Sequence, residues 1–325
     1  MIAKIQHTYS LLTLIRSQLT RKGSAGLSLS CGLALAAVLL LTPRAQASLA
    51  NLEALQSANA NLLDQYTFEG TSDATRLADT GSAANDLVRA AGADGGDVNN
   101  IQFVTGFDGV SQAYQPSFVA RRNGAGLVST GTTTLPASIT AEAVFQLDTF
   151  VPETSGDVSY LFSARSSAGR AYFMLQAADP TSRVTTTFGD TFSDRPAVLD
   201  YVPGDWYYMA VVAQYDSGAN ATTVDVYGAD LSANEAMLTH LLSDSTTFQG
   251  DWTGDTALGV GNFNNGTQEY LQGRLDNVAL TGEALSAGEL QSRLDALYVA
   301  VPEPATLGLG VLAGGLLLLF RRKRQ

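Results

Sequence analysis

The sequence predicts an all-β protein in which two antiparallel sheets pack as a jelly-roll sandwich, with an added helix at each end of the chain. Between residues 63 and 299, ten or more short segments rich in β-branched and aromatic residues alternate with turns of Gly, Asp, Asn and Ser. Charged residues make up 15% of the 325 residues, below the usual quarter. No internal repeat or long linker divides this region, so we expect one domain.

The clearest strand covers residues 139–147, ITAEAVFQL, where apolar and polar residues alternate. This pattern predicts one buried face and one solvent face. Residues 206–213, WYYMAVVA, are apolar on both faces, as in a central strand. A turn at 216–220 joins them to residues 222–227 in a predicted hairpin. Further strands are expected at 64–68, 101–104, 159–164, 170–176, 183–188, 257–260 and 271–280.

Two helical segments flank these strands. Ser286 and Glu289 have the spacing of a capping box, and leucines follow at helical steps up to Leu297. This pattern predicts a short helix that closes the domain. Residues 48–62, rich in Leu and Ala, fit either a spacer or a short helix, and the sequence leaves its docking on the sandwich open.

Residues 1–47 have the three parts of a signal peptide. A basic segment precedes the apolar run 27–41, and Ala45-Gln46-Ala47 forms an A-x-A cleavage site. We therefore expect export through the Sec translocon and a mature chain that begins at Ser48. The alternative is an anchor that is not cleaved.

Residues 300–325 form a second predicted targeting signal. Pro302, Glu303 and Pro304 precede an apolar run at 305–320, and four basic residues follow it. At 1.5 Å per residue this run would span about 24 Å, slightly short of the hydrocarbon core. The basic end is expected to stay in the cytoplasm. A plain C-terminal membrane anchor is the simpler alternative.

The order of these three parts, at the extreme C-terminus, resembles the PEP-CTERM sorting tag. The resemblance implies processing by exosortase, a membrane protease, in a Gram-negative bacterium that makes exopolysaccharide. It further implies transient anchoring in the inner membrane and then a place on the cell surface or in the extracellular matrix. The two prolines keep the segment before the helix extended, which suits a protease site.

Five segments of the middle region resemble LamG-like domains of the concanavalin A-like class. They occur in the family's order: YTFEG at 66–70, DTG at 79–81, ITAEAVFQ at 139–146, the hairpin 206–227, and GRLDNVALTGEALSAGELQSRL at 273–294. Asn277 replaces an acid of the family pattern, and Tyr207 and Tyr208 replace a His pair. These departures weaken any transfer of binding specificity.

The LamG resemblance implies a calcium ion where the opening and closing strands meet. Glu69, Asp79 and Asp276 stand at the matching positions and offer the oxygen ligands that Ca²⁺ prefers. The alternative is that these residues serve as turn formers.

The acidic composition bears on the partners. Ten arginines and 31 acids give residues 48–304 a formal charge of −21. Such a surface attracts divalent cations and excludes nucleic acid as a partner.

Sugar binding is the use of this fold that the resemblance implies. Phe263 and Asn264, in an Asn-rich loop, and Trp252, in a turn, could stack on and hydrogen-bond to a surface glycan or exopolysaccharide. The alternative is that both rings pack on the edge of the core.

No catalytic pattern accompanies these residues. The sequence has no paired-carboxylate run of a glycosidase, no Gly-x-Ser-x-Gly elbow and no phosphate loop. Cys31, in the leader, is the only cysteine. We predict a carbohydrate- or glycoprotein-binding surface module and not an enzyme. The alternative is a structural or adhesive matrix component without a small ligand.

Overall fold

A computed structural model describes residues 48–120, 122–148, 159–166, 171–178, 183–188, 195–197, 201–247, 254–262 and 269–298. All of them belong to one compact unit, residues 45–325. The predicted signal peptide, residues 1–47, and the predicted sorting tag with its membrane helix, residues 300–325, lie outside the described residues. Of the helices within the described ranges, none is long and apolar enough to cross a membrane.

The fold class predicted from the sequence is confirmed: two antiparallel sheets form a β-sandwich. The first sheet, called sheet A, has the order β15-β14-β13-β8-β17-β4-β3, with β1 also paired to β17. Its described strands are β1 (Leu62–Tyr66), β3 (Gln102–Thr105), β4 (Gln112–Gln115), β8 (Ile139–Leu147), β13 (Trp206–Asp216), β14 (Ala221–Asp230), β15 (Thr239–Thr247) and β17 (Gly273–Thr281).

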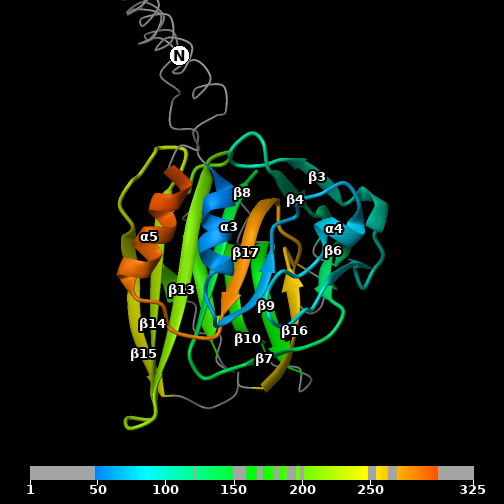
Figure 1. The fold of residues 1–325 in the computed structure, drawn as a ribbon. Helices are drawn as coiled ribbons and strands as arrows, with labels where there is room; N and C mark the ends of the chain where they lie inside the picture. Colours follow the sequence, from blue (N-terminus) through cyan, green and yellow to red (C-terminus); the bar gives the residue numbers. More distant parts are fainter. Residues whose placement is uncertain are drawn as a thin grey trace, which may run out of the picture. The chain divides into compact units, whose positions relative to one another are not determined.

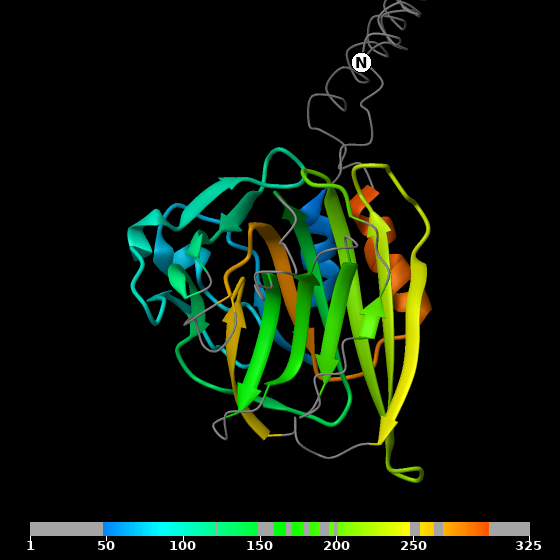
Figure 2. The same cartoon turned by 180° about the vertical axis from the view of Figure 1, so that it is seen from behind.

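The second sheet, sheet B, has the order β12-β11-β10-β9-β16-β6-β2, with β5 paired to β6 and β7 to β16. Its described strands are β2 (Leu87–Ala91), β5 (Ser117–Ala120), β6 (Asn123–Ser129), β7 (Thr133–Leu135), β9 (Ser159–Ser166), β10 (Ala171–Ala178), β11 (Arg183–Phe188), β12 (Arg195–Ala197) and β16 (Gly254–Val260). Figure 2 shows this sheet from its own side. The helical elements are α3 (Leu49–Ser57), α4 (Asp73–Arg76), the 3₁₀ turn η1 (Val98–Asn100) and α5 (Ala287–Tyr298).

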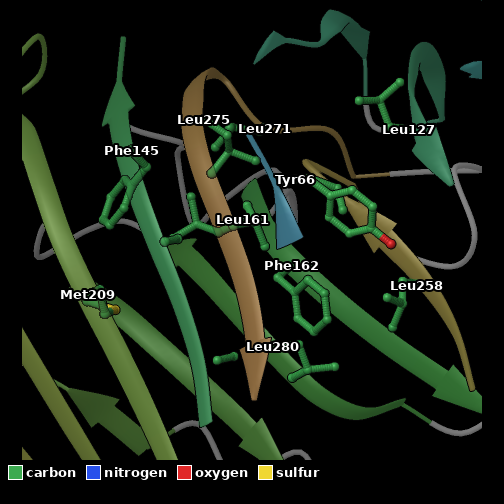
Figure 3. Close-up of a cluster of buried hydrophobic side chains, with 14 of the residues drawn as sticks. Tyr66, Leu127, Phe145, Leu161, Phe162, Met209, Leu258, Leu271, Leu275 and Leu280 are labelled. Atoms are coloured by element: carbon green, nitrogen blue, oxygen red, sulfur yellow. The ribbon is translucent and has the colours of Figure 1, made fainter. Parts of the chain in front are cut away.

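The main core lies between the two sheets. Phe145, Met209 and Leu275 of sheet A meet Leu161 and Phe162 of sheet B, and all five are at most 2% exposed. Figure 3 shows these side chains converging from both layers. Burial of each such side chain contributes about 1.5–3 kcal/mol, so this cluster is the main source of stability.

A second core lies on the other face of sheet A, where α3 and α5 cover the strands. Leu52 of α3 and Leu294 of α5 pack with Val144 and Tyr208, and all four side chains are fully buried. Figure 1 shows the two helices side by side over β8, β13 and β17. The central strands of sheet A, β8, β13 and β17, are therefore largely buried on both faces.

These helices correct the prediction that β8 is half-buried. All nine residues of β8 are buried, including Thr140 and Glu142 on the face expected to meet solvent. Glu142 is accommodated because the Arg293 guanidinium of α5 donates to it and the Tyr208 hydroxyl donates at 2.6 Å. Alternation predicts a polar face, but here helices cover that face and its polar groups are satisfied internally.

The two described ends of the chain meet at one place. The backbone N–H of Ser48 donates to the carbonyl of Leu297 at 2.9 Å, so the start of α3 is tied to the end of α5. The predicted capping box of α5 is present, because the Ser286 N–H donates to Glu289 Oε2 at 2.8 Å. Both cores lie within residues 48–298, so this segment closes its own fold.

Candidate cation site

Four carboxylates from distant parts of the chain form one acidic cluster. Glu53 comes from α3, Glu69 follows β1, Asp108 lies in the loop between β3 and β4, and Asp276 lies in β17. The first and last elements of the domain therefore meet here. We call these four residues the carboxylate cluster.

Asp276 occupies a β-bulge. In the pairing of β17 with β8, Leu275 faces Phe145 and Asn277 faces Val144, so Asp276 is the extra residue. A bulge redirects a side chain, and the Asp276 carboxylate meets the β3–β4 loop. Its Oδ2 accepts from the Phe107 N–H and from Ser111 Oγ, the latter at 2.8 Å. Its Oδ1 is buried and accepts no hydrogen bond.

The β3–β4 loop fits closely around this carboxylate. A Cβ on Gly106 would lie 2.4 and 2.5 Å from the two Asp276 oxygens, so a side chain there would displace the carboxylate. Asp108 shapes the same loop, because its Oδ1 accepts from the N–H groups of Val110 at 2.8 Å and Ser111 at 2.7 Å. Backbone N–H groups of the loop therefore hold the carboxylates of Asp108 and Asp276 close to it.

Glu69 and Glu53 complete the cluster. Glu69 Oε1 accepts from the Gln112 N–H at 2.7 Å, which joins the opening segment to β4. Glu53 Oε1 is buried and accepts no hydrogen bond. The ion pairs of the described residues that involve Arg293, Arg89 and Arg274 use other carboxylates.

The electrostatics of the cluster reflect this accumulation of negative charge. Burial, and then Glu69, Asp276 and Asp108, raise the pKa of Glu53 from 4.5 to about 8. Burial, with added repulsion from Asp108 and Glu69, raises the pKa of Asp276 from 3.8 to about 7. Burial also raises the pKa of Glu69. In each case burial is the largest cause, and repulsion from neighbouring carboxylates adds to it, so the ionised form of the cluster is disfavoured.

Asp108 behaves differently from the other three. Burial acts to raise its pKa, but hydrogen bonds from Ser111, Val110 and Leu49 outweigh burial and hold the pKa below its usual range. Asp108 is therefore the member of the cluster that stays ionised most readily.

The donor set suits a hard cation such as Ca²⁺, which takes six to eight oxygens from carboxylates and carbonyls. Two observations agree with this chemistry. Glu53 and Asp276 each have a buried oxygen without a hydrogen bond, and Gly106 lies close against both oxygens of Asp276. Across the described part of the chain, no three His, Cys, Asp or Glu side chains already stand at metal-coordinating positions. A calcium ion would therefore draw together carboxylates that repel one another without it.

Asp79, the third predicted ligand, belongs to another group. Its oxygens accept from the N–H groups of Gln65 and Asn85, both at 2.8 Å, and of Gly81 at 2.7 Å. Its neighbouring carboxyl group is Asp64, whose Oδ2 is buried and accepts no hydrogen bond. The structure thus brings Glu69 and Asp276 into one cluster. Asp79 lies outside this cluster, and its hydrogen bonds hold the backbone of its own loop.

The predicted sugar-binding residues Phe263, Asn264 and Trp252 lie outside the described residues. The base of the loop 263–268 is described and tightly held. Asn262 is fully buried, and its Nδ2 donates to the carbonyls of Leu127 at 2.7 Å and Val260 at 2.9 Å.

The loop base is connected to the carboxylate cluster through β4. A Cβ on Gly261, which has φ of +68°, would lie 2.7 Å from the Tyr114 ring. Tyr114 lies two residues after Gln112, the residue whose N–H binds Glu69. One four-residue strand thus contacts both regions.

Sequence reasoning missed Glu53 and Asp108. Asp108 follows Gly106 in a Gly-Phe-Asp-Gly turn, a signal that could have suggested a ligand loop. Glu53 carries no such signal, because nothing in the sequence shows that α3 docks beside β17.

No known protein family matches this chain, and no curated protein matches it. Among solved structures, domain 4 of AbnA, a GH43 extracellular arabinanase from Geobacillus stearothermophilus, is similar at 14% identity and a TM-score of 0.45, covering 73% of this chain and 98% of that one. Lectin I from Ulex europaeus is similar at 12% identity and a TM-score of 0.41, covering 68% and 98%. Trypanosoma rangeli sialidase is similar at 12% identity and 0.45, and the match covers 33% of that chain. At these values the likeness concerns the β-sandwich alone.

Proposed function

We propose that this protein is an exported, LamG-like surface module that binds calcium at the carboxylate cluster and a carbohydrate or glycoprotein through its loops. The observation that carries the proposal is the cluster itself. Buried carboxylates without compensating charge cost free energy unless they are protonated or bind a cation. In the proposed complex, Glu69 and Asp276 supply ligand oxygens.

The link through β4 supports a dependence of ligand binding on calcium. A cation that draws Glu69 towards Asp276 also fixes Gln112, since Gln112 donates to Glu69. The same strand contacts the base of the loop that contains Phe263 and Asn264. Calcium would thus order the loop base without touching the ligand.

The chain ends support the cellular part of the proposal. We propose cleavage after Ala47, transient anchoring through residues 305–320, and processing by exosortase at Pro302-Glu303-Pro304, with release to the cell surface or matrix. Intact mass of the exported protein tests this directly. Retention of Phe320 and the following arginines in the surface form would contradict processing at the tag.

Calcium binding is tested with residues 48–298 after removal of metal by EDTA. Saturating calcium, at 100 times Kd, stabilises a protein by about 2.7 kcal/mol. For a domain of this size, the melting temperature should rise by about 5–10 °C. Asp276→Asn should abolish the rise.

Asp216→Asn provides the matched control, because Asp216 caps an exposed turn through its Oδ1 and lies outside the cluster. The control should respond to calcium as the unmodified protein does. An unchanged melting temperature in the unmodified protein, with metal-free protein confirmed, rules calcium out.

Carbohydrate binding is tested on a polysaccharide and glycan array, once with calcium and once with EDTA. Binding that disappears in EDTA, and is lost in Phe263→Ala, supports the proposal. Absence of binding in both conditions favours the alternative, a structural or adhesive matrix component.

A further inference from the structure

We propose that the α-ammonium group created by cleavage before Ser48 binds beside Asp108 in the carboxylate cluster and fixes the joint between α3 and α5. This inference rests on the proposed export, because the amine exists only when the leader is removed after Ala47. The ligand of this site is the N-terminal ammonium group of the same chain.

The position of Ser48 is the first argument. Ser48 is only 8% exposed, and its backbone nitrogen lies 2.9 Å from the Leu297 carbonyl oxygen. The next N–H, of Leu49, donates to Asp108 Oδ2 at 3.3 Å. Successive backbone nitrogens are roughly 3–4 Å apart, so the Ser48 nitrogen lies within about 7 Å of that carboxylate.

The charges that face this point favour a cation. Asp108 contacts the start of α3, and Glu53, Glu69 and Asp276 complete the cluster, in which mutual repulsion adds to burial. The C-terminal end of α5 contributes partial negative charge through its last carbonyls. The dipole of the nine-residue α3 places a partial positive charge at the start of the helix, which opposes an ammonium there. The negative charges of the carboxylate cluster and of the end of α5 exceed this partial charge.

The charged residues in the last two turns of α5 have other partners. Arg293 is buried and pairs with Glu142 of β8. Asp295 is exposed and accepts from Gln291 Nε2 at 2.8 Å.

Cleavage changes the chemistry at Ser48 decisively. Before cleavage the nitrogen belongs to an amide with one N–H and no charge. Afterwards it is an ammonium with three donors and a full positive charge. Asp108 Oδ2, which accepts from the next N–H along the chain, is the carboxylate oxygen that these contacts place beside such a group.

The composition makes the inference directly measurable. Residues 48–298 contain no lysine, so the amine of Ser48 is the only primary amine in the mature domain. An amine-acylating reagent therefore reports on this one group. A buried, hydrogen-bonded amine reacts only when the structure opens locally.

The experiment compares three proteins ending at residue 298, all in EDTA: one that begins at Ser48, one that begins at Ala47, and one that begins at Nα-acetylated Ser48. The Ser48 form should melt about 2–4 °C above the other two. Its amine should be acylated about tenfold more slowly than that of the Ala47 form.

Asp108→Asn keeps the oxygen that accepts from Val110 and Ser111 but removes the charge. In this background the differences among the three proteins should disappear. Asp216→Asn, which makes the same change in an exposed turn, should leave them intact. If Asp108→Asn fails to fold, the acylation rates of the unsubstituted proteins still decide the question.

Equal melting temperatures for the three forms, together with equal acylation rates for the Ser48 and Ala47 forms, would overturn the inference. Differences that persist in Asp108→Asn would overturn the role of Asp108. The proteins are made with defined first residues, so these results do not depend on export. An exported protein that does not begin at Ser48 would instead contradict the proposed processing.

Discussion

Asp64 and Asp79 are neighbouring carboxyl groups with different hydrogen-bond partners. Asp79 accepts from three backbone N–H groups. Asp64 accepts from Thr133 Oγ1 at 2.8 Å and from the Tyr66 hydroxyl at 3.3 Å. Burial and the neighbouring Asp79 raise the pKa of Asp64 from 3.8 to about 7. Asp64 is therefore the carboxyl group that holds a proton more readily than a carboxyl group in water does.

This pair predicts an unusual dependence of stability on pH. Between pH 4 and 7 the folded state holds a proton on Asp64 that the unfolded state releases, so the free energy of unfolding falls as pH rises. The slope is at most about 1.4 kcal/mol per pH unit for one proton. Asp64→Asn, which mimics the protonated acid, should remove this part of the slope in urea titrations of metal-free protein at pH 5, 6 and 7. Parallel pH profiles for the two proteins would refute the assignment.

At the residue scale, the sequence predicted only part of the candidate site. Glu69 and Asp276 could be chosen because they stand in segments whose order resembles a known family. Glu53 and Asp108 join them through contacts across the whole chain, which local patterns do not contain. Asp79 looked the same as Glu69 in the sequence, and only its three N–H partners separate the two.

At the element scale, α5 determines how sheet A is buried. Its capping box and leucine spacing predicted the helix, and strand 139–147 was placed with the correct bounds. The face that α5 covers was not predictable, because Thr140 and Glu142 look like solvent-facing residues. The buried Glu142 carboxylate is paired with Arg293, 151 residues away, and the Thr140 hydroxyl is bound by the backbone of Glu283 and Leu285. The short strands β5 and β7 were not predicted, because their residue patterns are too short to indicate a strand. They are strands because they pair with β6 and β16.

The contact between α5 and β8 gives a test of this docking. Arg293→Met should leave Glu142 as a buried charge with only the Tyr208 hydroxyl, since the guanidinium is lost. Removing one partner of a buried ion pair costs about 3–5 kcal/mol. Urea unfolding at pH 7 measures this loss. The double variant Arg293→Met, Glu142→Gln should recover part of it, and a loss below about 1 kcal/mol in the single variant would contradict the account.

At the scale of the whole molecule, the charge between residues 48 and 304 is −21. Repulsion of this size keeps the protein soluble but destabilises the compact state. The Debye length falls from about 10 Å at 0.1 M salt to about 3 Å at 1 M. The melting temperature in EDTA should therefore rise with sodium chloride, and equally with choline chloride. A melting temperature that is flat or falls in both salts would show that self-repulsion is unimportant.

The hydrogen bond between Ser48 and Leu297 has a topological consequence. Because the ends of the folded segment touch, a linker of a few residues could join Tyr298 to Ser48. New termini could then be opened in the exposed β13–β14 turn at Ser217 and Gly218. Such a circular permutant would retain every strand pairing of sheet A, and Ser48 would carry an amide nitrogen in it. The same closeness of ends lets the domain be inserted as a unit into a loop of another protein, because it returns the chain almost to the point where it left.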